Sequence, residues 1–230
     1  MKLSVIIPAY NEERSIALLL DKVIEARLPD GVDKEILVIN DGSTDGTVRI
    51  VDQYVKESSV LLFHQENAGK TAAVLKGVKE SSGDIILIQD ADLEYDPAQY
   101  AQLLDPILDG KSSIVYGSRF MGTIQNMRFP NRLANIMTNL TLNMIYGTKL
   151  TDNNTCYKVF KKNVLDGITI TSSHFGFDCE VTVKWLKRGI PIYEVPIRYV
   201  GRTKAEGKKV NFVNTFFGSY LLIFKYAVRD

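Results

Sequence analysis

The chain has 230 residues, of which 45% are hydrophobic and 24% are charged, a composition ordinary for a folded protein with a sizeable core. Its formal net charge of +1 excludes the broadly basic surface that steers proteins to nucleic acid, so no nucleic-acid partner is expected. The only cysteines, Cys156 and Cys179, belong to no metal or disulfide motif and are expected to be buried thiols, as in a cytoplasmic protein.

Four strand-and-helix units are predicted in the first half of the chain. Strands are expected at residues 3–7, 35–39, 60–63 and 84–89, and the first run is too short for the apolar part of a signal peptide. The first two helices should each turn one apolar face inward, formed by Ile16, Leu19, Leu20, Val23 and Ile24, and then by Val48, Val51, Tyr54 and Val55. This series predicts an α/β fold with a mostly parallel central sheet and helices on both faces.

Polar loops follow the second and third strands, and in a parallel sheet they would gather with the other loops at one edge, where such sheets bind ligands. Asp41 and Asp45 are candidates for binding a base or a ribose, with a helix-capping turn as the alternative for Asp45. Gly69 and Lys70 stand at a helix start, where a phosphate could bind. The alternative for Lys70 is a solvated surface lysine.

The fourth strand ends in the sequence QDADLEYDP, which places two carboxylates close together. Asp90 and Asp92 offer hard oxygen ligands for Mg²⁺ or Mn²⁺, and an ion held this way usually also binds substrate phosphates. The alternative is that both aspartates only solubilise the strand end. Asp96 and Pro97 are the expected cap and first residue of a helix at 97–108.

The pattern changes after a fifth strand at residues 113–116. Between Arg119 and Thr151 there is no acidic residue, while four residues are basic: Arg119, Arg128, Arg132 and Lys149. A helix at 133–146 should carry apolar residues on one side, namely Leu133, Ile136, Met137, Leu140 and Met144. This stretch is either a core helix with a basic approach loop or a segment near a membrane whose arginines meet a phosphate.

The last third of the chain adds a strand at 157–160, a helix at 177–187 and an edge strand at 190–199. Residues 198–209 contain five basic residues and one acid, so this loop could close over an anionic ligand. Residues 211–230 are apolar but marginally short for a membrane span, and a membrane interface, a dimer contact and a cover for the core remain open. His64 and His174 show no partner pattern and receive no role.

Eight motifs in order carry a resemblance to a known family: VIIPAYNEE, VINDGSTDGT, ENAGKTAAVLKG, QDADLEYDP, YGSRF, TDNNTCYKVF, EVPIRYVGR and EGKK. Together they resemble family 2 glycosyltransferases of the GT-A fold, particularly those that act on polyprenyl phosphates. The resemblance implies one GT-A domain over residues 1–230. Residues 1–118 would form a Rossmann-like nucleotide-sugar half, residues 119–210 an acceptor half, and residues 211–230 an apolar helix.

The resemblance also implies roles for individual residues. Around the donor base and ribose it places Pro8, Tyr10, Glu12, Asp41 and Asp45. Asp90 and Asp92, with the Ala91 backbone beside them, would hold the metal, and Glu94 would add a third oxygen ligand. The acceptor phosphate would meet Arg119 and either Arg128 or Arg132, with Arg202 and Lys208 reaching phosphates from a mobile loop.

The reaction implied is Mg²⁺- or Mn²⁺-dependent, inverting transfer of a hexose from a GDP-mannose or UDP-glucose type donor to a dolichyl or undecaprenyl phosphate. Asp92 and Arg119 would be catalytic, and Asp152 would act as the base if the acceptor were a hydroxyl. The protein would lie on the cytoplasmic face of the membrane, bound directly or through a membrane subunit, and could be a homo-oligomer. The alternatives are transfer to a saccharide hydroxyl in polysaccharide synthesis and a non-catalytic nucleotide-sugar-binding subunit.

Overall fold

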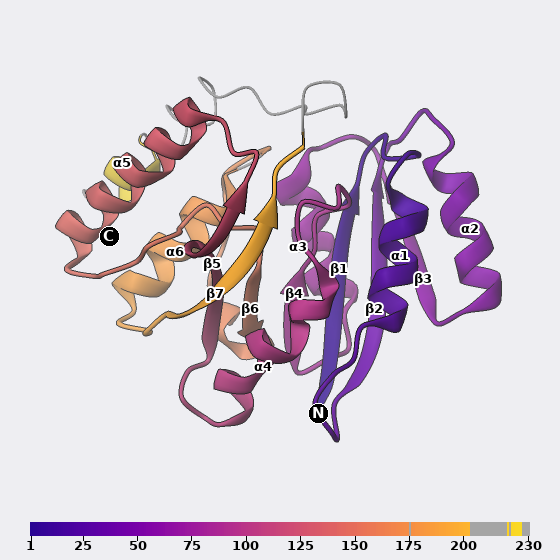
Figure 1. The fold of residues 1–230 in the computed structure, drawn as a ribbon, viewed down its shortest axis with the longest axis horizontal. Helices are drawn as coiled ribbons and strands as arrows, with labels where there is room; N and C mark the ends of the chain where they lie inside the picture. The colour runs from indigo at the N-terminus through magenta and orange to yellow at the C-terminus, as the bar shows by residue number, and fades with distance from the viewer. Residues whose placement is uncertain (175, 203–219, 221, 227–230) are drawn as a thin grey trace.

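The computed structural model describes residues 1–174, 176–202, 220 and 222–226 (Figure 1). Its strands are β1 (Lys2–Ala9), β2 (Asp33–Asp41), β3 (Val60–Gln65), β4 (Ile85–Ile88), β5 (Ile114–Gln125), β6 (Lys158–Lys161) and β7 (Tyr193–Val200). Its helices are α1 (Ile16–Glu25), α2 (Thr47–Glu57), α3 (Lys70–Glu80), α4 (Tyr100–Leu108), α5 (Phe129–Tyr146) and α6 (Phe177–Lys187), with short helical turns η1 (Pro97–Gln99) and η2 (Lys162–Leu165).

The strands form one seven-stranded sheet in the order β3-β2-β1-β4-β6-β5-β7. β1 pairs in parallel with β2 and β4, and β2 pairs in parallel with β3, so these four strands end at the same edge. β6 runs antiparallel between β4 and β5, and β7 lies parallel to β5 at the margin. The mostly parallel sheet and the edge strand expected from the sequence are both confirmed.

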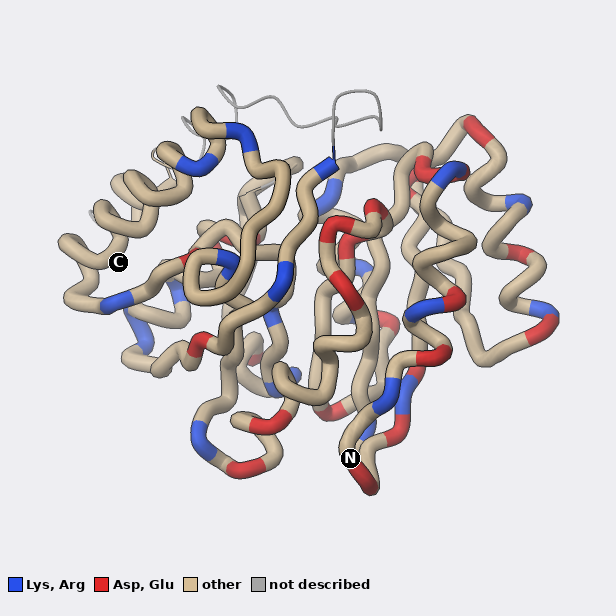
Figure 2. The backbone as a smooth tube through the Cα atoms, in the orientation of Figure 1, with Lys and Arg blue, Asp and Glu red and all other residues tan. Residues whose placement is uncertain are grey.

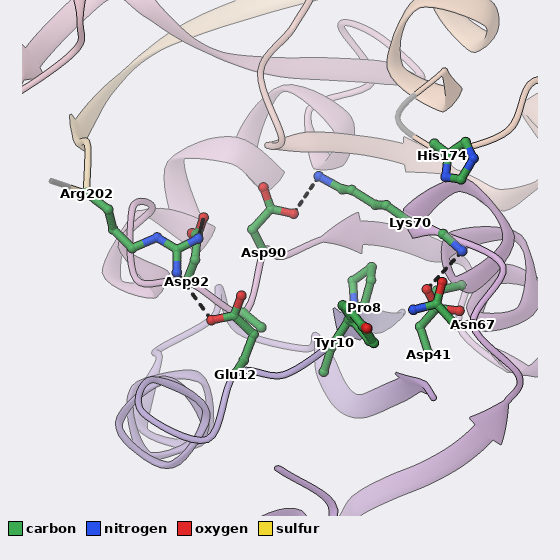
Figure 3. Close-up of a pocket in the computed structure, with 14 residues that line it drawn as sticks. Pro8, Tyr10, Glu12, Asp41, Asn67, Lys70, Asp90, Asp92, His174 and Arg202 are labelled. Atoms are coloured by element: carbon green, nitrogen blue, oxygen red, sulfur yellow. Dashed lines mark hydrogen bonds and ion pairs between the residues drawn. The ribbon is translucent and has the colours of Figure 1, made fainter. Parts of the chain in front are cut away.

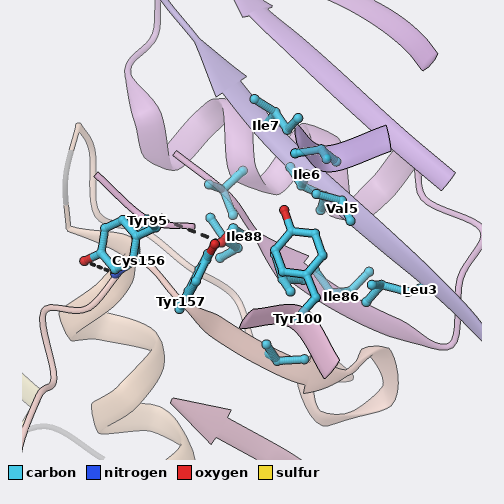
Figure 4. Close-up of a cluster of buried hydrophobic side chains, with 14 of the residues drawn as sticks. Leu3, Val5, Ile6, Ile7, Ile86, Ile88, Tyr95, Tyr100, Cys156 and Tyr157 are labelled. Carbon is cyan, nitrogen blue, oxygen red and sulfur yellow. Dashed lines mark hydrogen bonds between the residues drawn. The ribbon is translucent and has the colours of Figure 1, made fainter. Parts of the chain in front are cut away.

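The sheet is buried because helices cover both faces, with α1 and α2 in front of it and α3 and α6 behind it in Figure 1. All four residues of β4 are buried, as an apolar run without alternation requires. Beside it lie the rings of Tyr100 and Tyr157 (Figure 4). Their hydroxyls both donate to Gln89 Oε1 over 2.8 Å. This packing fixes the point at which the chain leaves the core, so that Asp90 and Asp92 lie at the carboxyl edge of the sheet.

Two apolar residues predicted to face inward lie on the surface. Ile24 is 39% exposed and Val55 is 40% exposed, whereas Leu20 and Val51 in the same helices are fully buried. Both exceptions lie in the last turn of their helices, at the end of the apolar stripe. The helical periodicity was therefore right for the middle of each helix and wrong for its end.

The segment after residue 113 differs most from the sequence-based prediction. β5 does not end at Tyr116 but continues to Gln125, and α5 begins at Phe129 rather than at residue 133. The predicted apolar side of α5 is exposed, from 38% at Ile136 to 81% at Met144, so the core-helix alternative is wrong. The buried side of α5 is instead formed by Ala134, Thr138, Asn139 and Leu142.

The described residues near the C-terminus pack beside α5 and α6. Ile223 is fully buried and shares a small apolar core with Leu142, Cys179 and Val183. These residues of the 211–230 segment therefore cover a core, which was one of its three predicted roles. Among the described residues, no helix combines the length and apolarity needed to span a membrane. Cys156 and Cys179 are both buried thiols outside any disulfide, as expected.

Candidate active site

A pocket of about 350 Å³ lies at the carboxyl edge of β1, β2 and β4, with further walls from the loop before α3 (Figure 3). It is lined by Pro8, Ala9, Tyr10, Glu12, Asp41, Asn67, Gly69, Lys70, Ala73, Asp90, Ala91, Asp92, His174 and Arg202. Every residue predicted to bind the donor, except Asp45, is among them. The structure thus brings together residues that are more than eighty positions apart in the sequence.

Asp41 ends β2 and holds the loop in front of α3. Its Oδ1 accepts hydrogen bonds from Gln65 Nε2 over 2.7 Å and from the Ala68 amide over 2.8 Å, and its Oδ2 accepts one from the Gly69 amide over 2.9 Å. Gly69 has a φ of +88°, which glycine adopts without strain. Asp41 therefore fixes the backbone that presents Asn67 and Lys70 to the pocket.

Asp45 lies outside the pocket and is engaged at the start of α2. Its Oδ1 accepts hydrogen bonds from the Thr47 amide over 3.0 Å and from the Thr47 hydroxyl over 2.6 Å. Burial raises the pKa of this carboxyl, but the hydrogen bonds from Thr47 and Glu13 outweigh that effect and lower it. The structure thus places Asp45 in the capping turn that was its alternative role.

Lys70 and Asp90 form an ion pair on one wall of the pocket. Lys70 Nζ lies 2.5 Å from Asp90 Oδ1, and the two side chains are only 18% and 24% exposed. Burial opposes both charges, yet their attraction prevails, so the pKa of Lys70 is raised well above its ordinary value and the pKa of Asp90 is lowered. The solvated-lysine alternative for Lys70 is wrong.

Asp92 points to the opposite side, toward Arg202. Arg202 Nη2 lies 3.0 Å from Asp92 Oδ2, and Nη1 lies 3.2 Å from Glu12 Oε2. Burial, together with the charges of Asp90 and Glu94, raises the pKa of the Asp92 carboxyl to about 7 although Arg202 opposes the rise. A cation at this position relieves repulsion among carboxylates, and Arg202 provides part of that relief.

Glu94 is placed just behind Asp92. Its Oε2 accepts a hydrogen bond from the Tyr199 hydroxyl over 2.6 Å, and its Oε1 accepts one from the Arg202 amide over 2.8 Å. Among the described residues, no three carboxylate, histidine or cysteine groups surround one point as a ready metal cage. The predicted set of Asp90, Asp92 and Glu94 is therefore not assembled around one point, because Asp90 pairs with Lys70 whereas Asp92 and Glu94 both contact Arg202.

The donor groups nevertheless suit a divalent ion. Mg²⁺ is usually bound by one or two carboxylates together with substrate phosphates, and a complete protein cage is not required. Asp92 offers a carboxylate at the pocket with an elevated pKa, which shows that negative charge there needs compensation. The residues present fit a divalent ion that arrives with a phosphate ligand, and Asp92 would be the carboxylate to hold it.

Arg119 and Asp152 form another ion pair, which is buried in the protein. Arg119 Nε donates to Asp152 Oδ2 and Nη2 donates to Asp152 Oδ1, both over 2.7 Å, and the Asp152 side chain is 0% exposed. Arg119 also lies over the Tyr199 ring, 5.2 Å from its centroid. Asp152 is therefore placed to orient Arg119, and a role as a general base would require this pair to break.

The remaining predicted acceptor residues lie away from the pocket. Arg128 and Arg132 are exposed at the start of α5, where Figure 2 shows basic residues and no acidic ones. Lys208 lies outside the described residues. Sequence reasoning also missed two pocket residues with functional side chains, Asn67 and His174. Asn67 stands in the loop before α3 that was already expected to bind a ligand, but His174 had no recognisable signal.

Comparison with protein families identifies the chain. The model of the family described as "Glycosyl transferase family 2" matches residues 4–169. The dolichol-phosphate mannosyltransferase of Pyrococcus furiosus is 30% identical over 221 residues, which cover 91% of this chain and 61% of that protein. The undecaprenyl-phosphate mannosyltransferase of Micrococcus luteus is 31% identical over 219 residues, covering 90% of this chain and 87% of that protein.

Solved structures agree on the fold. Glucosyl-3-phosphoglycerate synthase from Mycobacterium tuberculosis, in complex with Mn²⁺, UDP and phosphoglyceric acid, superposes with a TM-score of 0.76 at 19% identity, covering 99% of this chain and 78% of that one. This likeness confirms the GT-A architecture expected from the sequence. The present chain spans about three fifths of the length of the Pyrococcus relative. On the family match and these identities, the chain belongs to glycosyl transferase family 2.

Proposed function

We propose that this chain transfers a hexose from a nucleoside diphosphate hexose to a polyprenyl phosphate, with Mg²⁺ or Mn²⁺ as cofactor. The observation that carries the proposal is the pocket in which Asp90 and Asp92 follow β4, flanked by Lys70 and Arg202. Carboxylates beside cations at the carboxyl edge of a sheet suit a metal-bound diphosphate. The names of the relatives support the polyprenyl acceptor.

The pocket residues divide the work on the donor. Asp92 would hold the divalent ion, which supplies Lewis-acid neutralisation of the leaving diphosphate when bound. Lys70 keeps Asp90 ionised and turned away from Asp92, so the two aspartates do not act as equivalent ligands. Arg202 is placed to pass from Asp92 to a phosphate oxygen, because a guanidinium binds either partner through paired donors.

The burial and pairing of Asp152 favour a phosphate over a hydroxyl group as the acceptor. A hydroxyl acceptor needs a base to remove its proton, but Asp152 is buried and both of its carboxylate oxygens accept hydrogen bonds from the Arg119 guanidinium. A phosphate is already an anionic nucleophile. One phosphate oxygen forms a bond to the anomeric carbon while the bond from that carbon to the diphosphate breaks, and the electron pair leaves with the nucleoside diphosphate. Attack in line with the leaving group inverts the anomeric configuration.

The outer face of α5 supports a lipid acceptor. Its exposed apolar residues include Leu140 at 60% and Met144 at 81%, and no acidic residue occurs between Arg119 and Thr151. An apolar helix face with basic residues suits the surface of an anionic membrane. We place the chain, as part of this proposal, at the cytoplasmic membrane surface, where the acceptor phosphate would be presented.

The test is a turnover screen with UDP- and GDP-hexoses, Mg²⁺ or Mn²⁺, and a short polyprenyl phosphate. The proposal expects release of nucleoside diphosphate that depends on both metal and lipid, and a product of inverted configuration. A parallel reaction replaces the lipid with phosphoglycerate, the acid bound by the structural neighbour. Turnover with that acid or a saccharide but not with the lipid phosphate would overturn the proposed acceptor.

A further inference from the structure

Two pocket residues come from the part of the chain after residue 118, and they lie on opposite sides of the pocket. Figure 3 shows Arg202 beside Asp92 and Glu12, whereas His174 lies beyond Lys70, on the side of Asn67. If the donor diphosphate is bound near Asp92 and Arg202, the rest of the nucleotide extends toward the other side. His174 therefore stands where the nucleoside would be.

The backbone of His174 is held in an uncommon conformation. Its φ is +51°, in the left-handed region that few non-glycine residues adopt, asparagine, aspartate and histidine more often than the others. Its carbonyl oxygen accepts hydrogen bonds from the Thr71 amide over 2.7 Å and from the Thr71 hydroxyl over 2.8 Å, and the Phe177 amide donates to that hydroxyl over 3.1 Å. Non-glycine residues kept in this region concentrate at functional sites.

Gly69 allows the close contact between His174 and the start of α3. A Cβ atom at residue 69 would lie 2.9 Å from His174 Cα and 3.1 Å from its Nδ1, closer than a side chain could tolerate without movement. The φ of +88° at Gly69 is also strained for any larger residue. The contact thus depends on glycine at residue 69 and on the two hydrogen bonds that Thr71 donates to the His174 carbonyl oxygen.

Among the described residues, the imidazole of His174 has no hydrogen-bond partner, whereas Asp41 and Lys70 beside it are both engaged. Asp41 accepts three hydrogen bonds from Gln65 and from the loop before α3, and Lys70 is paired with Asp90. A neutral imidazole carries one donor and one acceptor nitrogen, so it can bind the edge of a base. His174 therefore offers an exposed ring at the pocket wall, on a backbone held by Thr71, with hydrogen-bonding capacity for a ligand.

We propose that His174 hydrogen-bonds the nucleobase of the donor and contributes to the choice between guanine and uracil nucleotides. This inference rests on the proposed function, since it assigns a residue within the same donor site. His174 is a specificity residue in this scheme and takes no part in the bond changes at the sugar.

The test compares His174→Gly and His174→Asn with the wild-type chain. Both variants suit a positive φ, so they remove the ring without disturbing the backbone. Calorimetry with Mn²⁺ should show about tenfold weaker binding of whichever of GDP and UDP the wild type prefers, the size of one net hydrogen bond, and a smaller preference between the two. Binding of inorganic pyrophosphate should be unchanged because it lacks a base.

The chain's other histidine supplies the matched control. His64 lies on β3 and does not line the pocket, so His64→Ala should bind both nucleotides as the wild type does. Unchanged nucleotide affinity and preference in His174→Gly would overturn the proposal. An equal loss of pyrophosphate binding would also overturn it, because the ring would then act on the phosphate side. Failure of the wild type to bind any nucleoside diphosphate would instead refute the donor site as a whole.

Discussion

The guanidinium of Arg202 holds one carboxylate oxygen of Asp92, the residue proposed to bind the divalent ion. Arg202 Nη2 lies 3.0 Å from Asp92 Oδ2, and the two side chains are 17% and 15% exposed. A metal on Asp92 must therefore displace Arg202 or share the oxygen with it. Arg202→Ala should bind Mn²⁺ alone about fivefold more tightly, since a partly exposed ion pair is worth about 1 kcal/mol. Electron paramagnetic resonance titration of free Mn²⁺ measures this directly.

Turnover by Arg202→Ala should fall even though its affinity for the metal rises, because the variant lacks the guanidinium that is proposed to bind the donor phosphates. Arg198→Ala is the matched control, since Arg198 is exposed on β7 and its replacement removes the same charge. Weaker Mn²⁺ binding by Arg202→Ala than by Arg198→Ala would show that Arg202 supports the metal site and does not compete with it.

Asp92→Asn should separate function from stability. Loss of the carboxylate should weaken Mn²⁺ binding and lower turnover, each by about a hundredfold or more. The fold should not suffer, because burial and neighbouring carboxylates hold the pKa of Asp92 near 7. Between the ordinary aspartate pKa of 3.8 and about pH 7, Asp92 is ionised in the unfolded chain but still protonated in the folded one. The free energy of unfolding of the metal-free wild type therefore falls as the pH rises through this range, whereas that of the variant does not.

Urea unfolding of both forms across this pH range, without metal, gives the comparison. The variant should be at least as stable as the wild type above pH 7. A variant that unfolds more easily throughout would mean that the Asp92 charge stabilises the fold. Normal turnover by a folded variant would remove Asp92 from the metal site.

Asp152→Asn tests whether this residue orients Arg119 or acts as a base. Removing one partner of a buried ion pair leaves an uncompensated charge, so the free energy of unfolding should fall by about 3 kcal/mol. Asp109→Asn is the control, because Asp109 pairs with Lys111 on the surface, where both side chains are more than half exposed, and should cost less than 1 kcal/mol. A variant of unchanged stability that has lost turnover would favour the base instead.

The first half of the fold was predictable because its signals are local. Each parallel strand is a short apolar run followed by polar or glycine-containing residues, as with Ile85–Ile88 before Asp90. The second half could not be predicted as well. Nothing in the residues after Tyr116 shows that β5 continues, since its extension to Gln125 pairs with β7 across a shifted register some eighty residues later. The exposure of the apolar side of α5 likewise depends on what the rest of the chain leaves uncovered.

The site could be predicted where the residue type alone indicates the chemistry. It could not be predicted where the role of a side chain depends on which residues it contacts in the fold. Asp41, Asp90 and Asp92 were expected in the pocket and line it. The pairing of Lys70 with Asp90 was not expected, because the packing of α3 against the sheet brings them together. The enclosure of Asp152 by Arg119 required the same kind of long-range information. His174 was missed because its proposed role depends on backbone geometry, which cannot be predicted from a single histidine in the sequence.

Glu35 should control the acid stability of the sheet far from the pocket. It lies at the amino end of β2, where Ser4, Ser82 and Lys2 contact its carboxylate over 2.5 to 2.7 Å. Burial alone would raise its pKa, but these contacts lower it from 4.5 to about 2. Its contribution to stability is complete above pH 4.5 and is lost as the pH falls toward 2.

Glu35→Gln should therefore unfold with about 1 to 3 kcal/mol less free energy at pH 7, and the difference should shrink between pH 4.5 and pH 2. Urea titrations at several pH values check this, with nucleotide binding at pH 7 as the control for an intact pocket. If the difference in the free energy of unfolding between the two forms stays constant down to pH 2, the variant has lost packing interactions and not the contribution of the Glu35 charge.

The outer face of α5 should decide whether the chain binds membranes. Leu140 and Met144 are 60% and 81% exposed on this acid-free helix, so Leu140→Asp with Met144→Asp should leave the free energy of unfolding within about 0.5 kcal/mol of the wild type. The same pair should weaken sedimentation with anionic liposomes about tenfold or more, since two apolar anchors become charges repelled by the lipid.

The control is Leu18→Asp, an exposed apolar residue of α1 that is 52% exposed and lies on a different helix. It should sediment with liposomes as the wild type does. Raising the salt concentration should weaken the binding of the wild type, because Arg128 and Arg132 lie exposed beside the same face and their attraction to lipid phosphates is screened. Equal sedimentation of the α5 variant and the Leu18 control would show that α5 is not the membrane-facing surface.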